Sequence, residues 1–299
     1  MKIILFALPG NEDLTNKLTN HLAAEKGEAI IRHFPDGETF VQLLSEVKEK
    51  CVIMVCTLHE PDEKILPLFF LCQTAKSLGA KYTCLVAPYL SYMRQDRQFH
   101  AGEGVTSDYF GRLLSGFADS LVTIDPHLHR RKNLSEIYSI PNIIVQAAGP
   151  ISSWIKANVR EPLLIGPDSE SEQWVSSIAQ SAGAPFIILQ KIRMGDRKVE
   201  VSFPNVEKYK DHTPVLIDDI ISTAHTMIET VIKIKNESMK PPVCIGTHAV
   251  FAGTAYEDLL NAGAGKIVTC NTIPHPSNQI DLSPILAENI KQLMNQMKF

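Results

Sequence analysis

The sequence predicts an α/β protein whose parallel sheets are covered by helices. Short apolar, β-branched runs bounded by polar or turn residues recur along the 299 residues, and amphipathic stretches lie between them. This alternation is typical of parallel sheets, because each crossover between parallel strands carries a helix back over the sheet. At the usual size of a domain, a chain of this length suggests about two such domains.

The expected elements follow one another in chain order. Ile3–Leu8 reads as a first buried strand and not as a signal peptide, because it is short and Pro9-Gly10-Asn11 ends it without a cleavage site. Further strands are expected at the short apolar runs Val52–Val55, Cys84–Pro88, Ser120–Ile124, Leu163–Ile165, Phe186–Leu189, Val215–Ile217, Cys244–Val250 and Lys266–Cys270. Helices are expected at the amphipathic stretches Lys64–Leu78, Ser107–Leu114, Ser171–Ala182, Thr226–Lys235 and Ser283–Lys298.

Two pairs of segments repeat about half a chain apart. Leu113–Thr123 and Leu259–Thr269 both run from a helix end through a Gly/Ala turn into a strand. Val52–Leu85 and Val215–Ile245 both read strand, loop, helix, strand. The repeat indicates either two domains of common ancestry or only the general likeness of any two αβ units.

A domain boundary is expected near Ala147–Ser152, where Gly149-Pro150 interrupts the pattern. The predicted domains are residues 1–147 and 148–299. The amphipathic final helix, Ser283–Lys298, is expected to pack on a domain face, which includes packing back on the N-terminal domain, or to form a subunit contact.

Composition and charge exclude several classes of protein. Hydrophobic residues make up 44% and charged residues 21%, which excludes a disordered chain. No apolar run approaches the ~20 residues of a membrane-spanning helix. The net charge of −4 argues against broad binding to nucleic acid. Six scattered cysteines without a C-x-x-C pair are expected to be buried thiols, so we expect a cytoplasmic protein without membrane or nucleic-acid partners.

The most informative segment is Val215–Thr226, where an apolar strand runs into Asp218 and Asp219 and a hydroxyl-rich loop then opens a helix. Backbone N–H groups at a helix N-terminus bind phosphate, and hydroxyls add donors. Adjacent carboxylates bind vicinal sugar hydroxyls or help to place Mg²⁺. An N-cap role for Ser222 or Thr223 explains one hydroxyl, but it does not explain two acids at a strand end, where desolvation is costly.

This segment resembles the ribose-phosphate-binding loop of type I phosphoribosyltransferases, and the chain from Phe34 to Pro274 resembles the ribose-phosphate pyrophosphokinases. The resemblance implies two tandem type I phosphoribosyltransferase-like domains. It implies transfer of the diphosphoryl group of ATP to the 1-hydroxyl of ribose 5-phosphate, giving phosphoribosyl pyrophosphate and AMP. It also implies Mg²⁺ as cofactor and a homodimer or hexamer whose ATP site is shared between subunits.

The same resemblance implies roles for individual residues. The Lys-x-Arg motif makes Lys191 and Arg193 the catalytic residues, in a flexible loop that continues through Met194–Glu200. The implied ATP-binding residues, from the Phe-x-Asp-Gly-Glu and Tyr-x-Arg-Gln-Asp-Arg motifs, are Phe34, Asp36, Gly37, Glu38, Arg94, Gln95 and Asp96. The implied ribose 5-phosphate ligands are Arg193, Asp218, Asp219, Ser222, Thr223, Ala224, His225 and Thr226. The implied metal ligands are His127 and Asp168.

Two segments depart from the family pattern. The phosphate loop of the family ends Thr-Gly-Gly-Thr, whereas Ala224 and His225 add Cβ atoms where glycine allows a positive φ, although a histidine also brings a ring N–H or a charge to a phosphate. Acids within Ser169–Glu172 repel a pyrophosphate unless Mg²⁺ intervenes or they point outward. The alternatives are a catalytically weak regulatory relative, or a phosphotransferase or phosphoribosyltransferase acting on a related sugar phosphate.

Overall fold

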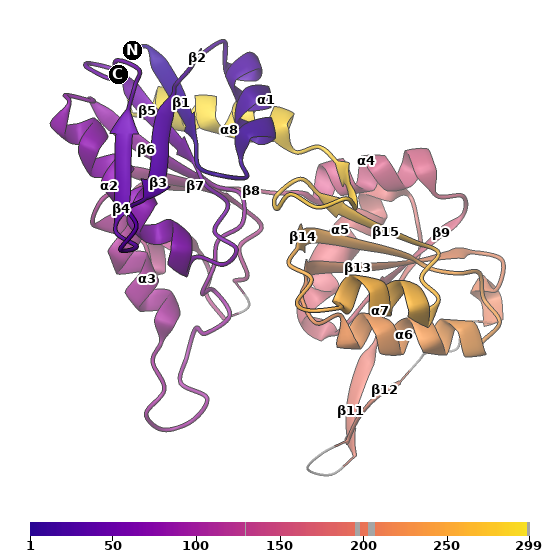
Figure 1. Ribbon diagram of the computed structural model, residues 1–299. Helices are drawn as coiled ribbons and strands as arrows, with labels where there is room; N and C mark the ends of the chain where they lie inside the picture. Colours follow the sequence, from indigo (N-terminus) through magenta and orange to yellow (C-terminus); the bar gives the residue numbers. More distant parts are fainter. Residues whose placement is uncertain (129, 195–197, 203–206, 298–299) are drawn as a thin grey trace. The chain divides into compact units, whose positions relative to one another are not determined.

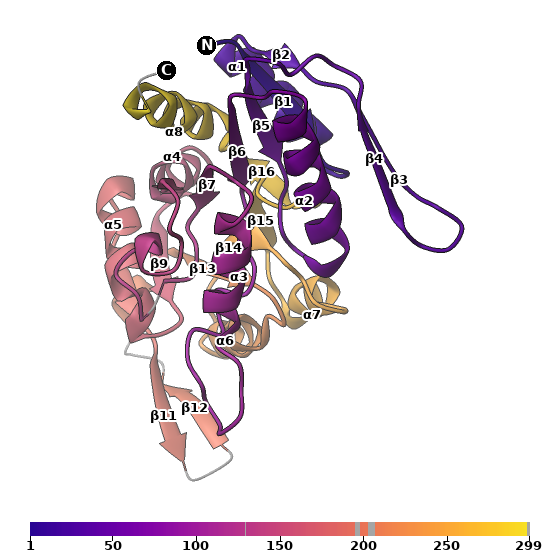
Figure 2. The ribbon, with the colours of Figure 1, turned by 90° about the vertical axis from the view of Figure 1, so that its left-hand side faces the viewer.

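The computed structural model describes residues 1–128, 130–194, 198–202 and 207–297, with the backbone alone at residues 170, 190–194 and 198–202. Its contacts define two compact units. Unit 1 comprises Met1–Val145, Thr272–Pro274 and Ser283–Phe299, and unit 2 comprises Gln146–Asn271 and His275–Leu282. Each unit contains a six-stranded parallel sheet with helices packed on it, which confirms the predicted fold class (Figure 1; Figure 2). No helix in the described part of the chain is long and apolar enough to cross a bilayer.

The sheet of unit 1 has the strand order β2-β1-β5-β6-β7-β8. Its strands are β1 (Ile3–Ala7), β2 (Glu25–Lys26), β5 (Cys51–Val55), β6 (Tyr82–Ala87), β7 (Ser120–Ile124) and β8 (Asn142–Val145). Its helices are α1 (Glu12–Leu22), α2 (Asp62–Ser77), α3 (Thr106–Ser115) and α8 (Ser283–Gln296), with a 3₁₀ turn at Leu134–Glu136. The final helix, α8, packs against α1 and β8.

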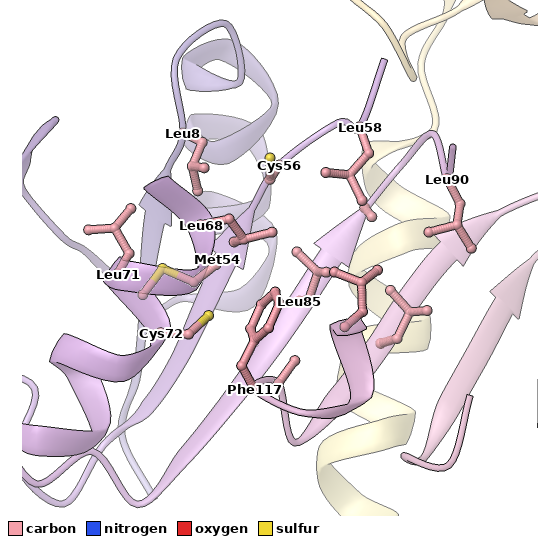
Figure 3. Packing of buried hydrophobic residues seen from close by; sticks show 14 of the residues in the cluster. Leu8, Met54, Cys56, Leu58, Leu68, Leu71, Cys72, Leu85, Leu90 and Phe117 are labelled. Atoms are coloured by element: carbon pink, nitrogen blue, oxygen red, sulfur yellow. The ribbon is translucent and has the colours of Figure 1, made fainter. Parts of the chain in front are cut away.

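The core of unit 1 lies between its sheet and the helices α2 and α3. Every residue of β5, β6 and β7 is buried, as expected for parallel strands that are covered on both faces. Figure 3 shows Met54 and Leu85 of the sheet packed with Leu68, Cys72 and Phe117. This packing fixes the carboxyl ends of the strands, from which the loops of interest begin.

The sheet of unit 2 has the order β10-β9-β13-β14-β15-β16. Its strands are β9 (Pro162–Gly166), β10 (Phe186–Ile188), β13 (Thr213–Ile221), β14 (Val243–Ala249), β15 (Lys266–Cys270) and β16 (Asn278–Ile280). Its helices are α4 (Ala148–Asn158), α5 (Glu172–Ala182), α6 (His225–Asn236) and α7 (Ala255–Ala262), with 3₁₀ turns at Ser169–Ser171 and Glu207–Tyr209. Helix α4 packs beside α5, and α6 packs beside α7.

The two sheets have the same topology, strand for strand. The repeated sequence segments fall at equivalent places, because β5–α2–β6 corresponds to β13–α6–β14 and α3–β7 corresponds to α7–β15. Each unit also inserts an antiparallel hairpin between the second and third strands of its sheet in chain order. These hairpins are β3 (Ala29–His33) with β4 (Thr39–Leu43), and β11 (Gln190–Met194) with β12 (Lys198–Ser202). Shared insertions support common ancestry over a general likeness of αβ units.

One predicted strand is too short. The apolar run Val215–Ile217 predicts a strand that stops before the two acids, but β13 continues to Ile221. The cause is its neighbour β14, whose backbone pairs with β13 as far as Ile221 opposite Ala249. The side chain of Ile221 fills the space beside Gly246, where an added Cβ would come within 2.6 Å of it. Asp218 and Asp219 therefore lie inside the strand.

Candidate active site

In unit 2, two neighbouring strands bring carboxylates together near their carboxyl ends. Strand β9 pairs with β13, and Asp168 follows β9 by two residues while Asp218 lies in β13. Asp168 is close enough for its charge to contribute to the pKa of Asp218. A small cavity is lined by Pro167 next to Asp168, by Asp218 and by Thr226 at the start of α6. The structure thus brings Asp168, Asp218 and the N-terminus of α6 into one place.

Asp218 is held in an environment that disfavours its negative charge. Desolvation raises its pKa well above the usual range, and the neighbouring charge of Asp219 and then that of Asp168 add to the effect. The backbone N–H of Asp219 donates to Oδ1 of Asp218 at 3.0 Å. This hydrogen bond lowers the pKa of Asp218, because it stabilises the charged form. A carboxylate in this state favours a ligand that donates hydrogen bonds or carries positive charge.

The loop before α6 has no hydroxyl cap. Helix α6 begins at His225, and its N-cap is Ala224, whose side chain makes no capping hydrogen bond. The alternative that Ser222 or Thr223 serves as the N-cap is therefore wrong. His225 is exposed at the first helical position, and Thr226 is half-buried. The first turn of α6 presents backbone N–H groups of the kind that bind a phosphate.

Ala224 has a backbone conformation that favours glycine. Its φ of 56° and ψ of 9° lie in the left-handed region, where a Cβ atom is unfavourable. Of the two positions at which the sequence departs from glycine, Ala224 has a positive φ, whereas His225 is the first residue of α6. The departure from glycine thus carries a conformational cost, and the turn itself is retained.

The segment after β14 holds this loop in place. The N–H of Phe251 donates to the carbonyl of Ile221 at 2.8 Å, and the N–H of Ala252 donates to the carbonyl of Ser222 at 3.1 Å. Phe251 itself has a φ of 35°, and its ring packs on His275 with centroids 4.6 Å apart. The sequence gives no signal that Phe251 supports the phosphate loop, because the contact joins residues about 30 positions apart.

The segment Ser169–Glu172, the second that departs from the family pattern, begins with a turn that Asp168 caps. Oδ1 of Asp168 accepts from the N–H of Ser171 at 3.3 Å, and the Ser171 hydroxyl donates to the Asp168 carbonyl at 2.6 Å. Glu172 is exposed in the first turn of α5, where an acid suits the helix dipole. This agrees with the outward-pointing alternative for Glu172. The side chain of Glu170 lies outside the described atoms.

In unit 1, one group of predicted ATP-binding residues and the predicted metal ligand His127 follow two adjacent strands. Arg94, Gln95 and Asp96 lie in the loop after β6, and His127 follows β7. Arg94 is exposed. The side-chain amide of Gln95 donates to Glu103 at 3.2 Å, within the same loop. The carboxylate of Asp96 is paired with Arg130, a residue to which sequence analysis assigns no role.

The residues Phe34–Glu38 form the tip of the β3–β4 hairpin. Gly37 closes the turn with a φ of 90° and donates its N–H to the Phe34 carbonyl at 2.9 Å. Phe34 is 40% exposed, and the guanidinium of Arg32 lies 4.7 Å from its ring centroid. The hairpin tip projects away from the loop between β6 and α3 (Figure 2). Within one chain, these two groups of predicted ATP ligands are not brought together.

The predicted catalytic residues lie on the hairpin of unit 2. In β11, Lys191 is opposite Val201 and Arg193 is opposite Val199. Alternate residues of a strand share one face, so Lys191 and Arg193 are on the same face of the hairpin. Their side chains, and residues 195–197 of the expected flexible loop, lie outside the described part of the structure.

No cluster of three or more His, Cys, Asp or Glu side chains with metal-binding geometry occurs among the described residues. The two predicted metal ligands belong to different units, His127 to unit 1 and Asp168 to unit 2. The six cysteines are all buried free thiols, as predicted.

Comparison with known proteins identifies the family. Residues 3–117 match the N-terminal domain of ribose phosphate pyrophosphokinase, and residues 133–283 match a phosphoribosyl transferase domain. The ribose-phosphate pyrophosphokinase of Methanobrevibacter smithii is 28% identical over 290 residues, which cover 92% of this chain and 96% of that protein. The corresponding protein of Saccharolobus solfataricus is 30% identical over 245 residues, covering 80% of this chain and 82% of its own.

A solved structure agrees with the fold. The crystal structure of phosphoribosylpyrophosphate synthetase from Mycobacterium smegmatis superimposes with a TM-score of 0.85 at 22% identity, covering 99% of this chain and 100% of that one. The topology of two like units, the motif residues and the relatives that match along most of the chain agree with one another. The chain belongs to the family of ribose-phosphate pyrophosphokinases.

Proposed function

We propose that the chain transfers the diphosphoryl group of ATP to the 1-hydroxyl of ribose 5-phosphate in a Mg²⁺-dependent reaction. The sugar oxygen attacks the β-phosphorus, the bond from that phosphorus to the bridging oxygen of the α-phosphate breaks, AMP leaves and the hydroxyl proton is released. The observation that carries the proposal is the pair Asp218 and Asp219, placed in β13 immediately before the N-terminus of α6.

The arrangement in unit 2 suits a sugar phosphate. The carboxylates of Asp218 and Asp219 accept hydrogen bonds from vicinal ribose hydroxyls and orient the sugar for attack. The first-turn N–H groups of α6, with the hydroxyls of Ser222 and Thr223, bind the 5-phosphate. A donor bound to Asp218 would also relieve the unfavourable burial of its charge.

The nucleotide side of the reaction requires neutralisation of negative charge more than covalent chemistry. We assign this role to Lys191, Arg193 and Arg94, since a guanidinium or ammonium group close to the transferred phosphoryl group stabilises developing charge. Phe34, Asp36, Gly37 and Glu38 would contact the nucleotide from a neighbouring subunit. Their exposure at the tip of a projecting hairpin, apart from Arg94, supports a homodimer or hexamer with a shared ATP site.

The donor set fits Mg²⁺. Carboxylate oxygens are the ligands that Mg²⁺ prefers, and Asp218 experiences the negative charges of both Asp219 and Asp168. We propose that Asp168 is a metal ligand in unit 2 and that His127 is a metal ligand in unit 1. When bound, Mg²⁺ supplies neutralisation of the diphosphoryl charge. The six buried thiols are consistent with a reducing compartment, and we propose a cytoplasmic location.

The left-handed Ala224 favours one second candidate, a catalytically weak relative that regulates a true synthetase. The test is an incubation of the chain with ATP, ribose 5-phosphate and Mg²⁺, with products identified by mass spectrometry. Phosphoribosyl pyrophosphate with AMP supports the proposal, whereas ADP would indicate an ordinary kinase. Failure of the folded chain to bind ribose 5-phosphate would favour the regulatory relative. Asp258→Asn, an acid substitution on exposed α7, is a control for Asp219→Asn.

A further inference from the structure

Asp96 belongs to a predicted ATP-binding motif, yet its carboxylate is already engaged. The Asp96 side chain is only 5% exposed, although the neighbouring Arg94 and Arg97 are exposed. Nη1 of Arg130 lies 3.0 Å from Oδ1 and 3.2 Å from Oδ2 of Asp96. The two oxygens are therefore directed at a guanidinium of the same chain and are shielded from solvent.

A second arginine holds the same turn of backbone. Nη2 of Arg131 donates to the carbonyl of Asp96 at 3.4 Å and also contacts the carboxylate of Asp108, in the first turn of α3. Arg131 is largely enclosed, with 17% of its side chain exposed. Arg130 and Arg131 follow His127 by three and four residues in the loop after β7. The contacts thus join the loop after β6, the loop after β7 and the start of α3.

We propose that Asp96 and Arg130 form a clamp that positions Arg94 and Gln95 for the nucleotide, and that Asp96 is a positioning residue and not a nucleotide ligand. This inference rests on the proposed function, in which ATP binds at this loop. A free carboxylate beside Arg94 would repel a triphosphate, whereas a carboxylate paired with Arg130 brings no net negative charge. The clamp also fixes the loop after β6 against the loop that carries His127.

The clamp predicts that the effects of substituting Asp96 and Arg130 on ATP affinity are not additive. Removing either partner leaves the other unpaired and releases the same loop, so Asp96→Asn and Arg130→Gln should have the same effect. We expect each substitution to weaken ATP binding about 10-fold by calorimetry. The double variant should also be about 10-fold weaker, which corresponds to a coupling of about 1.4 kcal/mol. Affinity for ribose 5-phosphate should stay unchanged in all three variants.

Limited trypsin digestion gives a readout that does not depend on ATP. Cleavage after Arg94 and Arg97, followed by mass spectrometry, should be several-fold faster in both single variants than in the unsubstituted chain. The control is Asp13→Asn, which removes an acid from an ion pair of the same unit, 3.0 Å from Lys17 on the exposed surface of α1. It should change neither cleavage nor ATP affinity.

Three outcomes would overturn the proposal. An additive loss of about 100-fold in the double variant would show that Asp96 contacts the nucleotide by itself. Unchanged ATP affinity and unchanged cleavage would show that the ion pair contributes nothing. Failure of the unsubstituted chain to bind ATP would refute the proposed function together with the positioning role, and the digestion would still report whether Arg130 restrains the loop.

Discussion

Replacing Ala224 by glycine is expected to stabilise the folded chain. Ala224 sits at φ 56°, where an L-residue with a Cβ costs about 1–2 kcal/mol. Glycine loses about 0.4–1 kcal/mol more backbone entropy than alanine when the chain folds. The difference predicts a net gain of about 1 kcal/mol, which corresponds to an increase in melting temperature of about 2–4 °C.

Two further alanine-to-glycine substitutions serve as controls. They distinguish the effect of a left-handed backbone from the effect of glycine itself on stability. Ala23 is exposed at the C-terminus of α1 with φ 49°, so Ala23→Gly should give a similar gain in a part of unit 1 remote from the predicted site residues. Ala157 is exposed in the last turn of α4, a helical position at which glycine should cost up to about 1 kcal/mol. The assay is thermal and urea unfolding of the three variants. A loss of stability in Ala224→Gly comparable to that in Ala157→Gly would refute the conformational argument.

The same variant tests whether the Cβ of Ala224 obstructs the phosphate. Ala224→Gly should bind ribose 5-phosphate at least as tightly as the unsubstituted chain, because a Cβ is removed from the loop that the phosphate approaches. Ala23→Gly should leave that affinity unchanged. Weaker binding in Ala224→Gly, despite higher stability, would mean that the methyl group contributes to the site.

Three further predictions concern the charged residues. Lys191→Ala should lower kcat about 10²–10³-fold with a smaller change in ligand affinity, and equal losses in both would contradict a transition-state role. Asp219→Asn should weaken ribose 5-phosphate binding about 10-fold and ATP binding little, as measured by calorimetry; an unchanged sugar-phosphate affinity would remove Asp219 from the sugar site. Burial raises the pKa of Asp218 in the folded state, so its contribution to stability is present below its unfolded pKa and is lost as pH rises through the folded value. Asp218→Asn should therefore raise the melting temperature at pH 8 more than at pH 4, and parallel pH profiles of the two proteins would disprove this.

The fully buried strands were predictable because each of them is a continuous apolar run in the sequence. Ser120–Ile124 and Lys266–Cys270 are strands with the bounds expected from the sequence, since each is an apolar run that ends where the strand ends. The prediction fails for β13, in which the two acids Asp218 and Asp219 interrupt the apolar run while backbone pairing with β14 continues. Apolarity marks where a strand is buried, and it misses the part of a strand that faces a polar site.

In the candidate site, the sequence reveals the motif residues but not the residues that hold them in place. Motif residues such as Arg94 and Asp219 were found because their spacing along the chain is itself the signal. The partners that hold them were not found, because the Asp96–Arg130 contact spans 34 residues and the Phe251–Ile221 contact spans about 30. A sequence shows that acids and bases are present, but the pairing between them is a property of the folded loops.

The equivalent loop of unit 1 differs in its side chains from the proposed phosphate site, and the helix that follows it, α2, has Asp62 and Glu63 in its first turn. In unit 2 the loop between the third strand and its helix leads to the N–H groups of α6. In the equivalent loop of unit 1, Nζ of Lys64 donates to the carbonyls of Thr57 at 3.2 Å and His59 at 2.6 Å, and lies 2.9 Å from Nδ1 of His59.

The half-buried ammonium group of Lys64 engages two backbone carbonyls of this loop. The hydrogen bonds turn the Lys64 side chain back onto this loop, and desolvation lowers the pKa of its ammonium group. The carbonyls that surround it are acceptors, whereas a phosphate requires donors. Unit 1 thus keeps the strand order of a phosphate-binding unit with a loop that is closed by its own lysine. The shared fold provides the position of each loop, and the side chains in the loop determine whether an anion can bind there.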